Sequence, residues 1–313
     1  MNNVILIYIL SFLILGSSFP CRSQESDLVN NEVHVVALNA AFDGNIETLK
    51  AVISDLDINK IRGEHNETLL HSAVFGGKPD VINLLISAGA DIEARDGYDH
   101  TPLQVVIATR NSELAKLFIN AGSRVNEIGE RQSSLLLLAC DDLVAPVDAS
   151  IIELLAKAGS DTTIRNSTGD APLHMLVKQG NLSGVEALIR SGADIELRGQ
   201  QHTTALINAA AKGNTEIMKV LIKAGAEIDA VANVEKNWSM TAISAAAMEG
   251  KVEAVALLLK AGAGINANKK EHVQAIKELI GEQKFAFQFN AVRVTNYEKI
   301  ERLLNNIDTF NYQ

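Results

Sequence analysis

Apolar residues recur along this chain in short segments with helical spacing, separated by polar stretches that contain glycine. Val255, Leu258 and Leu259, for example, show the i, i+3, i+4 spacing of a helix with one buried face. The segments come in pairs, and in most pairs one glycine lies between the two members and another follows the second. Small side chains such as Ala73 and Ala209 allow neighbouring helices to approach closely. The pattern predicts an all-α fold built from helix pairs with projecting loops.

The pairs repeat at a nearly constant period. Their first helices are expected to start near residues 35, 68, 101, 134, 171, 204 and 241, so that the successive steps are 33, 33, 33, 37, 33 and 37. The two longer steps indicate four-residue insertions in a unit of otherwise constant length. A single helix pair cannot bury its own apolar face, so a repeat of this kind predicts a stack of units.

Most first helices begin with a variant of one short motif. It reads TLLHSA at Thr68–Ala73, TPLQ at Thr101–Gln104 and APLH at Ala171–His174. Thr can cap a helix start by accepting a hydrogen bond from a free backbone N–H, and Pro at the next position loses no hydrogen bond there. A glycine that follows most starts at the same spacing is expected to form a left-handed turn between the two helices. The third position of the motif predicts a buried row: Leu70, Leu103, Leu136, Leu173, Leu206 and Ile243.

These motifs resemble the ankyrin repeat, whose signature includes Thr-Pro-Leu-His and has the same period. The resemblance covers about residues 31–267. It implies a solenoid of seven to eight stacked helix-turn-helix units with projecting hairpin loops, in which His71 and His174 form hydrogen bonds between adjacent loops. It also implies that a protein partner binds the concave face formed by the hairpin tips and the first helices.

The two ends of the array depart from the motif. The unit that starts near Val35 lacks the hexapeptide and is interpreted as an N-terminal capping repeat. Residues 268–313 are expected to form a degenerate eighth unit that closes the stack, with helices at 272–280 and 297–305 and with Thr295 in place of the turn glycine. The Phe residues at 285, 287 and 289 are expected to be buried under this cap, and a binding patch is the alternative.

Residues 1–23 resemble a secretory signal peptide. The run from Val4 to Leu15 is apolar and is too short for a comfortable membrane span. Small residues follow it, so cleavage is expected after Ser18 or Ser23, and the mature chain would be secreted or periplasmic. No Lys or Arg precedes the run. An uncleaved anchor and a lipid anchor at Cys21 therefore stay open, and membrane contact is expected only if this segment is retained.

Charge and motif content argue against chemistry of the chain's own. The net charge of −10 disfavours nucleic acid, whose phosphates would be repelled. Cys140 lies in a leucine run and is expected to be a small buried apolar side chain. No zinc-ligand spacing, phosphate-binding loop or acid–base–nucleophile set is present in the sequence. We therefore expect no cofactor, metal or small-molecule substrate, and no enzyme activity. A hydrolase using Cys140 or His174 on an ankyrin scaffold is the less favoured alternative.

The register of the repeat places specific residues on the predicted partner surface. Tyr98, His100 and Phe75 are expected to form one patch, and Trp238 lies in a longer hairpin of the seventh unit. Tyr and Trp are frequent hot-spot residues at protein interfaces. Arginines recur at one position before several starts, which predicts either a partner-binding basic stripe or a merely solvated one: Arg62, Arg95, Arg165 and Arg198.

Together these features predict an exported, non-catalytic module that binds a protein. Two settings remain open at this point. One is an immunity-like factor of a bacterial envelope, and the other is an effector directed at a host. The fold itself does not identify the target.

Overall fold

The computed structural model describes residues 28–54, 56–126, 134–141, 147–235, 238–263, 269–288 and 290–305. The chain divides into two compact units, Met1–Arg124 and Val125–Gln313. Each unit is a succession of short helix pairs, as predicted for an all-α repeat fold. The predicted signal segment at residues 1–23 and residues 142–146 of a predicted insertion lie outside the described part of the chain.

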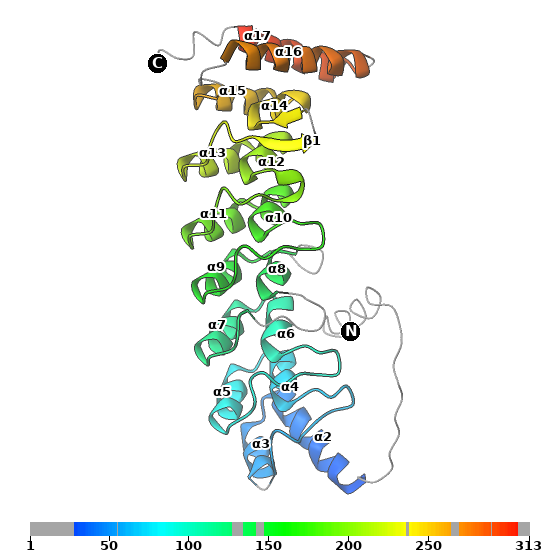
Figure 1. Ribbon diagram of the computed structural model, residues 1–313. Helices are drawn as coiled ribbons and strands as arrows, with labels where there is room; N and C mark the ends of the chain where they lie inside the picture. The colour runs from blue at the N-terminus through cyan, green and yellow to red at the C-terminus, as the bar shows by residue number, and fades with distance from the viewer. Residues whose placement is uncertain are drawn as a thin grey trace. The chain divides into compact units, whose positions relative to one another are not determined.

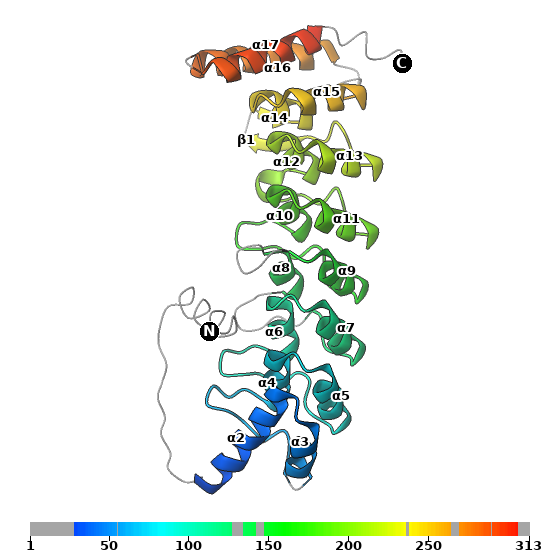
Figure 2. The same ribbon diagram turned by 180° about the vertical axis from the view of Figure 1, so that it is seen from behind.

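The first unit contains three helix pairs within its described residues. They are α2 (Leu28–Asp43) with α3 (Ile46–Ile53), α4 (Leu69–Gly76) with α5 (Pro79–Ser87), and α6 (Pro102–Ala108) with α7 (Ser112–Asn120). Helix α4 packs against α2 on one side and α6 on the other, so the first helices form one row. Figure 1 shows α3, α5 and α7 in a second row beside them, and Figure 2 shows the same two rows from behind.

The second unit continues the pattern of paired helices. Its pairs are α8 (Leu135–Cys140) with α9 (Ala149–Lys157), α10 (Pro172–Gln179) with α11 (Leu182–Arg190), α12 (Ala205–Lys212) with α13 (Thr215–Lys223), and α14 (Ala242–Met248) with α15 (Val252–Lys260). The last pair is α16 (Lys269–Ala286) with α17 (Ala291–Asn305), which pack on α14 and α15 respectively. The short 3-10 helix η1 (Gln200–His202) precedes α12.

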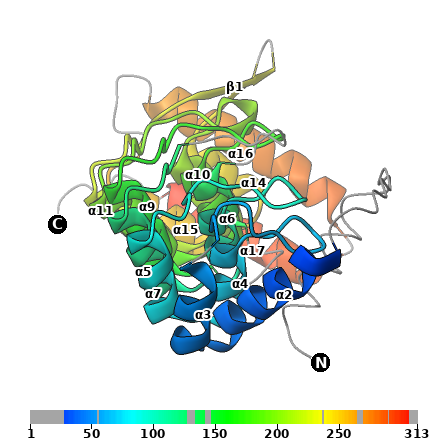
Figure 3. The ribbon, with the colours of Figure 1, turned by 90° about the horizontal axis from the view of Figure 1, so that it is seen from below.

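One short β-hairpin interrupts this helical unit. Strand β1 (Ala232–Glu235) pairs antiparallel with β2 (Trp238–Met240), and the register is Ala232 with Met240. The hairpin lies in the longer loop that the sequence predicts before the seventh start. In Figure 3, β1 lies at the margin of the second unit, beyond α10 and α14.

The local sequence explains where the first helices begin. The predicted starts at residues 68, 101, 134, 204 and 241 are N-cap residues whose side chains accept a hydrogen bond from a backbone N–H of the first turn. Ala171 occupies the same place before α10 but has no side chain that can cap. At the other end, Gly77 and Gly180 have left-handed φ values of 64° and 76°. The turn between the two helices of a pair needs this conformation, which glycine adopts without strain.

The core follows the predicted rows of apolar residues. Each residue at the third motif position is at most 2% exposed: Leu70, Leu103, Leu136, Leu173, Leu206 and Ile243. Cys140 is fully buried at the end of α8, as expected for a small apolar side chain. Because these side chains contact the neighbouring helices of their own unit, each pair is stabilised by the pairs beside it.

The first helix starts earlier than the repeat register indicates. Val35 was expected near its start, yet α2 begins at Leu28. Residues 28–34 contain neither Gly nor Pro, so nothing in them stops the helix from extending backwards. The outer side of α2 also carries partly exposed Val33, Val35 and Val36, which is unusual for a repeat that caps a stack.

The C-terminal pair differs from the predicted degenerate unit. Its two helices are longer than expected, and α17 runs through residues 295–296, where a turn was predicted. Thr295 does not act as the turn glycine, because its hydroxyl donates to the Ala291 carbonyl inside a continuous helix, at 2.8 Å. A Thr that bonds back to its own helix gives the chain no reason to turn there.

The expectation that the Phe cluster is buried is wrong for Phe285, which is 74% exposed. Phe287 is partly buried, and the guanidinium of Arg293 lies over its ring at 4.1 Å from the centroid. This is the geometry of a cation–π contact. The side chain of Phe289 is outside the described residues. Phe285 lies in the last turn of the long helix α16 (Lys269–Ala286).

Candidate functional site

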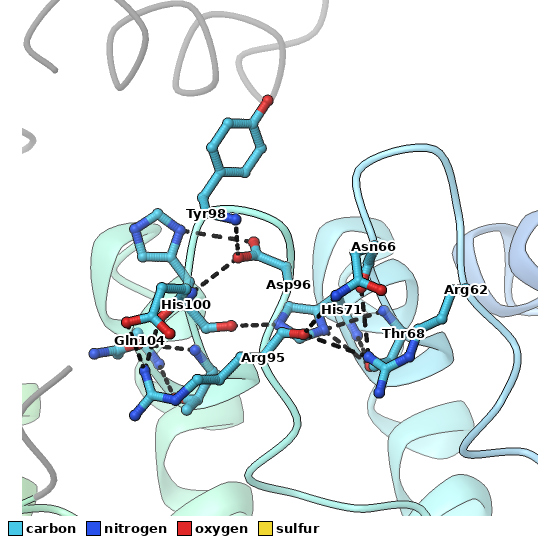
Figure 4. Close-up of polar contacts among 11 residues, drawn as sticks. Arg62, Asn66, Thr68, His71, Arg95, Asp96, Tyr98, His100 and Gln104 are labelled. Atoms are coloured by element: carbon cyan, nitrogen blue, oxygen red, sulfur yellow. Dashed lines mark hydrogen bonds and ion pairs between the residues drawn. The ribbon is translucent and has the colours of Figure 1, made fainter. Parts of the chain in front are cut away.

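The second hairpin of the first unit, residues 95–100, is folded by one buried carboxylate. Asp96 Oδ1 accepts hydrogen bonds from the backbone N–H groups of Tyr98 and His100, at 2.9 and 2.8 Å. The Asp96 N–H donates to the His100 carbonyl at 3.0 Å, and Asp99 takes a left-handed φ of 66° to complete the turn. Asp side chains favour such turns because they bond to backbone two residues on. The result is a fixed loop tip from which Tyr98 projects (Figure 4).

The first hairpin, residues 62–67, is tied directly to the second. The Gly97 N–H donates to the His65 carbonyl at 2.6 Å. A Cβ atom on residue 97 would lie 2.6 Å from that same oxygen, so only glycine permits this approach. The ring centroids of His65 and Tyr98 are 5.8 Å apart. The ring centroids of Tyr98 and His100 are 6.2 Å apart, and these two rings are stacked. We call His65, Tyr98 and His100 the ring cluster.

His71 connects the second hairpin to helix α4. Its Nε2 is 2.9 Å from the His100 carbonyl oxygen, and its Nδ1 is 3.3 Å from the Thr68 backbone nitrogen. A neutral ring that carries its proton on Nε2 donates to the carbonyl and accepts from the Thr68 N–H at once. Burial lowers the pKa of His71, which keeps the ring neutral, although the charge of Asp96 opposes this shift. The predicted bond between adjacent loops is therefore present (Figure 4).

The charges under the ring cluster are negative. Burial alone would raise the pKa of Asp96, but contacts from the side chain and backbone N–H of His100 outweigh it and hold that pKa below its usual value. Asp96 Oδ2 is buried without a hydrogen bond, and His100 Nδ1 lies 3.6 Å from it. Partial burial and the charges of Asp96 and Glu67 raise the pKa of Tyr98. The Tyr98 ring thus sits in a field that favours cations.

The predicted arginine stripe has an internal role in both units. Each of these guanidinium groups donates to a backbone carbonyl further on in its own hairpin, at distances of 2.7 to 3.4 Å: Arg62, Arg95, Arg165 and Arg198. Arg62 and Arg198 also donate to the carbonyls of Arg95 and Val231, one repeat further on. Arg95 forms an ion pair with Asp99. The side chains brace the hairpins, and contact with a partner stays a prediction.

The second unit has a different polar cluster beside its hairpins. Lys178 Nζ donates to Asp170 Oδ2 at 2.6 Å and to Gln200 Oε1 at 3.2 Å. Burial would raise the pKa of Asp170, but Lys178 and the Gln200 N–H lower it overall. His174 Nε2 lies 3.2 Å from the Thr203 carbonyl oxygen, so His174 also connects two loops. These contacts fix loops rather than present a reactive group.

The structure brings together only part of the predicted patch. Tyr98 and His100 are adjacent in the ring cluster. Phe75, partly exposed near the end of α4, is not a member of either ring pair. Trp238 begins β2, and its side chain lies outside the described residues. His65 was missed, although the repeat itself contains the signal: it stands at the same distance before a start as Tyr98 and Trp238 do in their units.

The described part of the chain contains neither a group of metal-binding side chains nor a membrane-spanning helix. No three His, Cys, Asp or Glu side chains among the described residues are grouped to hold a metal ion. The same residues include no helix that is both long and apolar enough to cross a membrane. The geometry is that of a scaffold whose loops are cross-braced by buried side chains.

Comparison with known proteins agrees with this architecture. The family model "Ankyrin repeats (3 copies)" matches overlapping stretches at residues 37–129, 70–166, 136–232 and 173–271. The chain belongs to the ankyrin-repeat family. The ankyrin repeat domain of Bcl-3, a member of the IkappaB family, has the same fold, with a TM-score of 0.60 at 20% identity over 71% of this chain and 97% of that one.

Several ankyrin-repeat relatives are similar in sequence. The ankyrin repeat and KH domain-containing protein CBG24701 of Caenorhabditis briggsae is 28% identical over 55% of this chain, and Protein PhlB of Serratia liquefaciens is 29% identical over 53%. The match spans 71% of PhlB but only 7% of CBG24701, and 18% of the chicken NF-kappa-B p105 subunit. The chain therefore spans a small part of the length of most of these relatives.

Proposed function

We propose that this ankyrin-repeat chain is an exported, non-catalytic module that binds a protein partner through its hairpin tips and first helices. The ring cluster is the single observation that carries the proposal. Three side chains that the core does not require are held together at the tips of two hairpins by hydrogen bonds from Asp96, Gly97 and His71. Loop tips that are cross-braced in this way are typical of a binding surface supported by a rigid scaffold.

Protein binding fits the rest of the molecule. Ankyrin stacks are scaffolds that present extended surfaces, and they are typically non-catalytic. The rigidity of the hairpins lowers the entropy cost of binding a partner. Tyr98 and Trp238 hold the same register position and belong to the residue types most frequent at interface hot spots. The acidic net charge of −10 makes nucleic acid a poor partner.

Crosslinking and affinity capture from the native compartment test this function. A full-length chain with a C-terminal tag is compared with the double variant Tyr98→Ala, Trp238→Ala. We expect a specific protein to be captured by the parent and recovered several-fold less by the variant. The control is Lys223→Ala, an exposed position at the end of the outer helix α13, which should capture as the parent does. Equal recovery by all three chains would refute the binding surface, and no specific capture would refute the function.

Export is a separate part of the proposal and rests on the apolar run from Val4 to Leu15. Its length is that of a signal-peptide core, and small residues follow it. The test is subcellular fractionation of the natural source followed by N-terminal sequencing. Mature chains starting after Ser18 or Ser23 in the exported fraction would support cleavage. An intact N-terminus in the membrane fraction would instead indicate a retained anchor.

A further inference from the structure

The ring cluster has a feature that protein binding in general does not require, namely the sign of its surroundings. The two hairpins, residues 62–67 and 95–100, carry four carboxylates and two guanidinium groups. Both guanidinium groups donate to hairpin carbonyls, and that of Arg95 also pairs with Asp99. Four carboxylates against two guanidinium groups leave an excess of two negative charges on these hairpins. The cluster therefore combines aromatic faces with excess negative charge.

Tyr98 occupies the centre of this arrangement. Its ring is flanked by the rings of His65 and His100 and projects from the hairpin, while its backbone N–H is fixed by Asp96 (Figure 4). The charges of Asp96 and Glu67 reach it, since they raise the pKa of its hydroxyl. An aromatic face is attracted to cations through its quadrupole, and nearby carboxylates add to that attraction. The guanidinium of arginine also stacks on aromatic rings.

We infer that the ring cluster anchors an arginine-containing basic segment of the protein partner, with the guanidinium over Tyr98 and its charge matched by Glu67 and its neighbours. This inference rests on the proposed function and names the chemistry of its partner. The anchor costs little ordering on binding, because the Gly97 to His65 bond and the bonds to Asp96 already fix both hairpins.

The test uses the full-length chain and a labelled peptide of alternating arginine and glycine, with fluorescence anisotropy as readout. A citrulline peptide of the same length is the probe control, because citrulline keeps the planar shape of arginine but lacks its charge and has a carbonyl oxygen in place of one NH2 group. A leucine–glycine peptide tests for an apolar occupant. We expect the parent to bind the arginine peptide and to bind the other two at least several-fold more weakly.

Three variants locate that binding on the chain. Tyr98→Ala should weaken the arginine peptide about two- to fivefold, the factor of an exposed cation–π contact, while Tyr98→Phe should bind like the parent. Glu67→Gln should weaken binding about twofold, as an exposed charge pair does. The Gln side chain keeps an oxygen acceptor for the His65 backbone N–H, which donates to Glu67 Oε2 at 2.8 Å in the parent. Glu253→Gln, the same charge change at an exposed position of α15, should have no effect. Circular dichroism checks that all variants stay folded.

Several results would overturn the inference. They are no measurable arginine-peptide binding by the parent, equal binding of the citrulline peptide, tighter binding of the leucine peptide, or an unchanged affinity of Tyr98→Ala. The peptide assay reads the cluster alone, whereas affinity capture reads the whole chain. If a protein is still captured in a Tyr98-dependent way while the arginine peptide fails, the proposed function stands and only the basic partner is rejected. If nothing specific is captured, the function itself fails.

Discussion

His71 and His174 occupy the same slot of the repeat but have different partners. Nδ1 of His71 lies near the N–H and hydroxyl of Thr68, whereas Nδ1 of His174 is buried without a hydrogen bond. Ala171, which stands where the other helices have Thr or Ser, lacks the hydroxyl that lies 2.8 Å from Nδ1 of His71. A buried polar atom without a partner costs about 1–3 kcal/mol. The α10 start is therefore weaker than the five first-helix starts that have a side-chain cap.

Ala171→Thr should raise the free energy of unfolding by about 1 kcal/mol, because it restores the helix cap and gives His174 Nδ1 a donor. The equivalent Thr204 is only 1% exposed, so the same slot of the next unit accommodates a buried Thr side chain. Urea denaturation at pH 7 measures the change. The matched control is Thr204→Ala, which should lower the free energy of unfolding by a similar amount. Unchanged or reduced stability in Ala171→Thr would contradict this account of the orphaned nitrogen.

The two buried histidines also make stability depend on pH. Burial lowers the pKa of each, against the opposing charges of Asp96 and Asp170. The folded chain therefore favours the neutral rings, whereas unfolded histidine takes up a proton near pH 6.5. The stabilisation is fully present above that pH and is lost as the pH falls below it. Asp96 and Asp170, whose pKa values are lowered, add a further loss in stronger acid, below about pH 4.

His71→Gln should reduce the fall in unfolding free energy between pH 7 and pH 5. Gln104 in the next unit shows that the amide fits this slot, because its Oε1 accepts from the Thr101 N–H at 2.8 Å. The variant removes one buried group that must charge on acidification, so urea curves at pH 7, 6 and 5 should be closer together than those of the parent. His65→Gln, at an exposed position, should keep the parental spacing. An equally steep loss in His71→Gln would remove His71 as its source.

Some of the site could be read from sequence at this scale, and some could not. Tyr98 and His100 follow from the hairpin register, and His65 would have followed from the same register. The bracing role of Arg95 could not be read in this way. Its bond to the Asp99 carbonyl depends on the left-handed φ of Asp99, which a repeat alignment does not contain. The close approach at Gly97 likewise arises only when two hairpins lie side by side.

At the scale of elements, the contact between α2 and α4 depends on a single hydrogen atom. A Cβ on Gly76 would overlap the Phe42 carbonyl oxygen. Gly76→Ala should therefore push the two helices apart and lower the free energy of unfolding by about 1–3 kcal/mol, as overpacking does. Gly281→Ala in α16, where a Cβ meets no close neighbour, should instead stabilise its helix by up to about 1 kcal/mol. Urea denaturation of both variants is the measurement. Equal changes in the free energy of unfolding for the two variants would mean that α2 shifts without cost to accommodate the added methyl group.

The starts of most first helices were predictable because the signals that set them are local in sequence. The lengths of the helices at the two ends of the array were not predictable. A capping Thr or Ser and a following Pro stop the chain from extending a helix backwards, which is why α6 begins at Pro102. Residues 28–34 contain no Ser, Thr, Gly or Pro, and α2 extends back to Leu28. In α17 the expected turn at Thr295 is absent. A left-handed turn favours glycine, and the matching position of Thr295 in the repeat does not replace it.

For the whole molecule, the sequence indicates a stack because the motif recurs, and this prediction of fold is confirmed. The division into two compact units between Arg124 and Val125 was not predicted. The step from the start at 101 to that at 134 has the ordinary length of the repeat, so the repeat contains no mark of the boundary. A division into compact units depends on how many contacts each helix pair makes with the next. The repeated motif shows only that helix pairs follow one another, and it does not show how many contacts join them.

In a stack of this kind, a substitution that destabilises one helix is expected to destabilise the neighbouring helix pairs of the same unit as well. Leu206 in α12 is 1% exposed, and α12 packs against α10, α13 and α14. Leu206→Asp would bury a carboxylate without a partner, which destabilises the fold strongly. Because each pair is stabilised by its neighbours, we expect amide protection from hydrogen exchange to fall in α10 and α14 as well as in α12. The thermal unfolding midpoint should fall too. Lys212→Asp, an exposed change in the same helix, should leave both readouts near parental values. Loss of protection confined to α12 would show that the helix pairs are energetically independent.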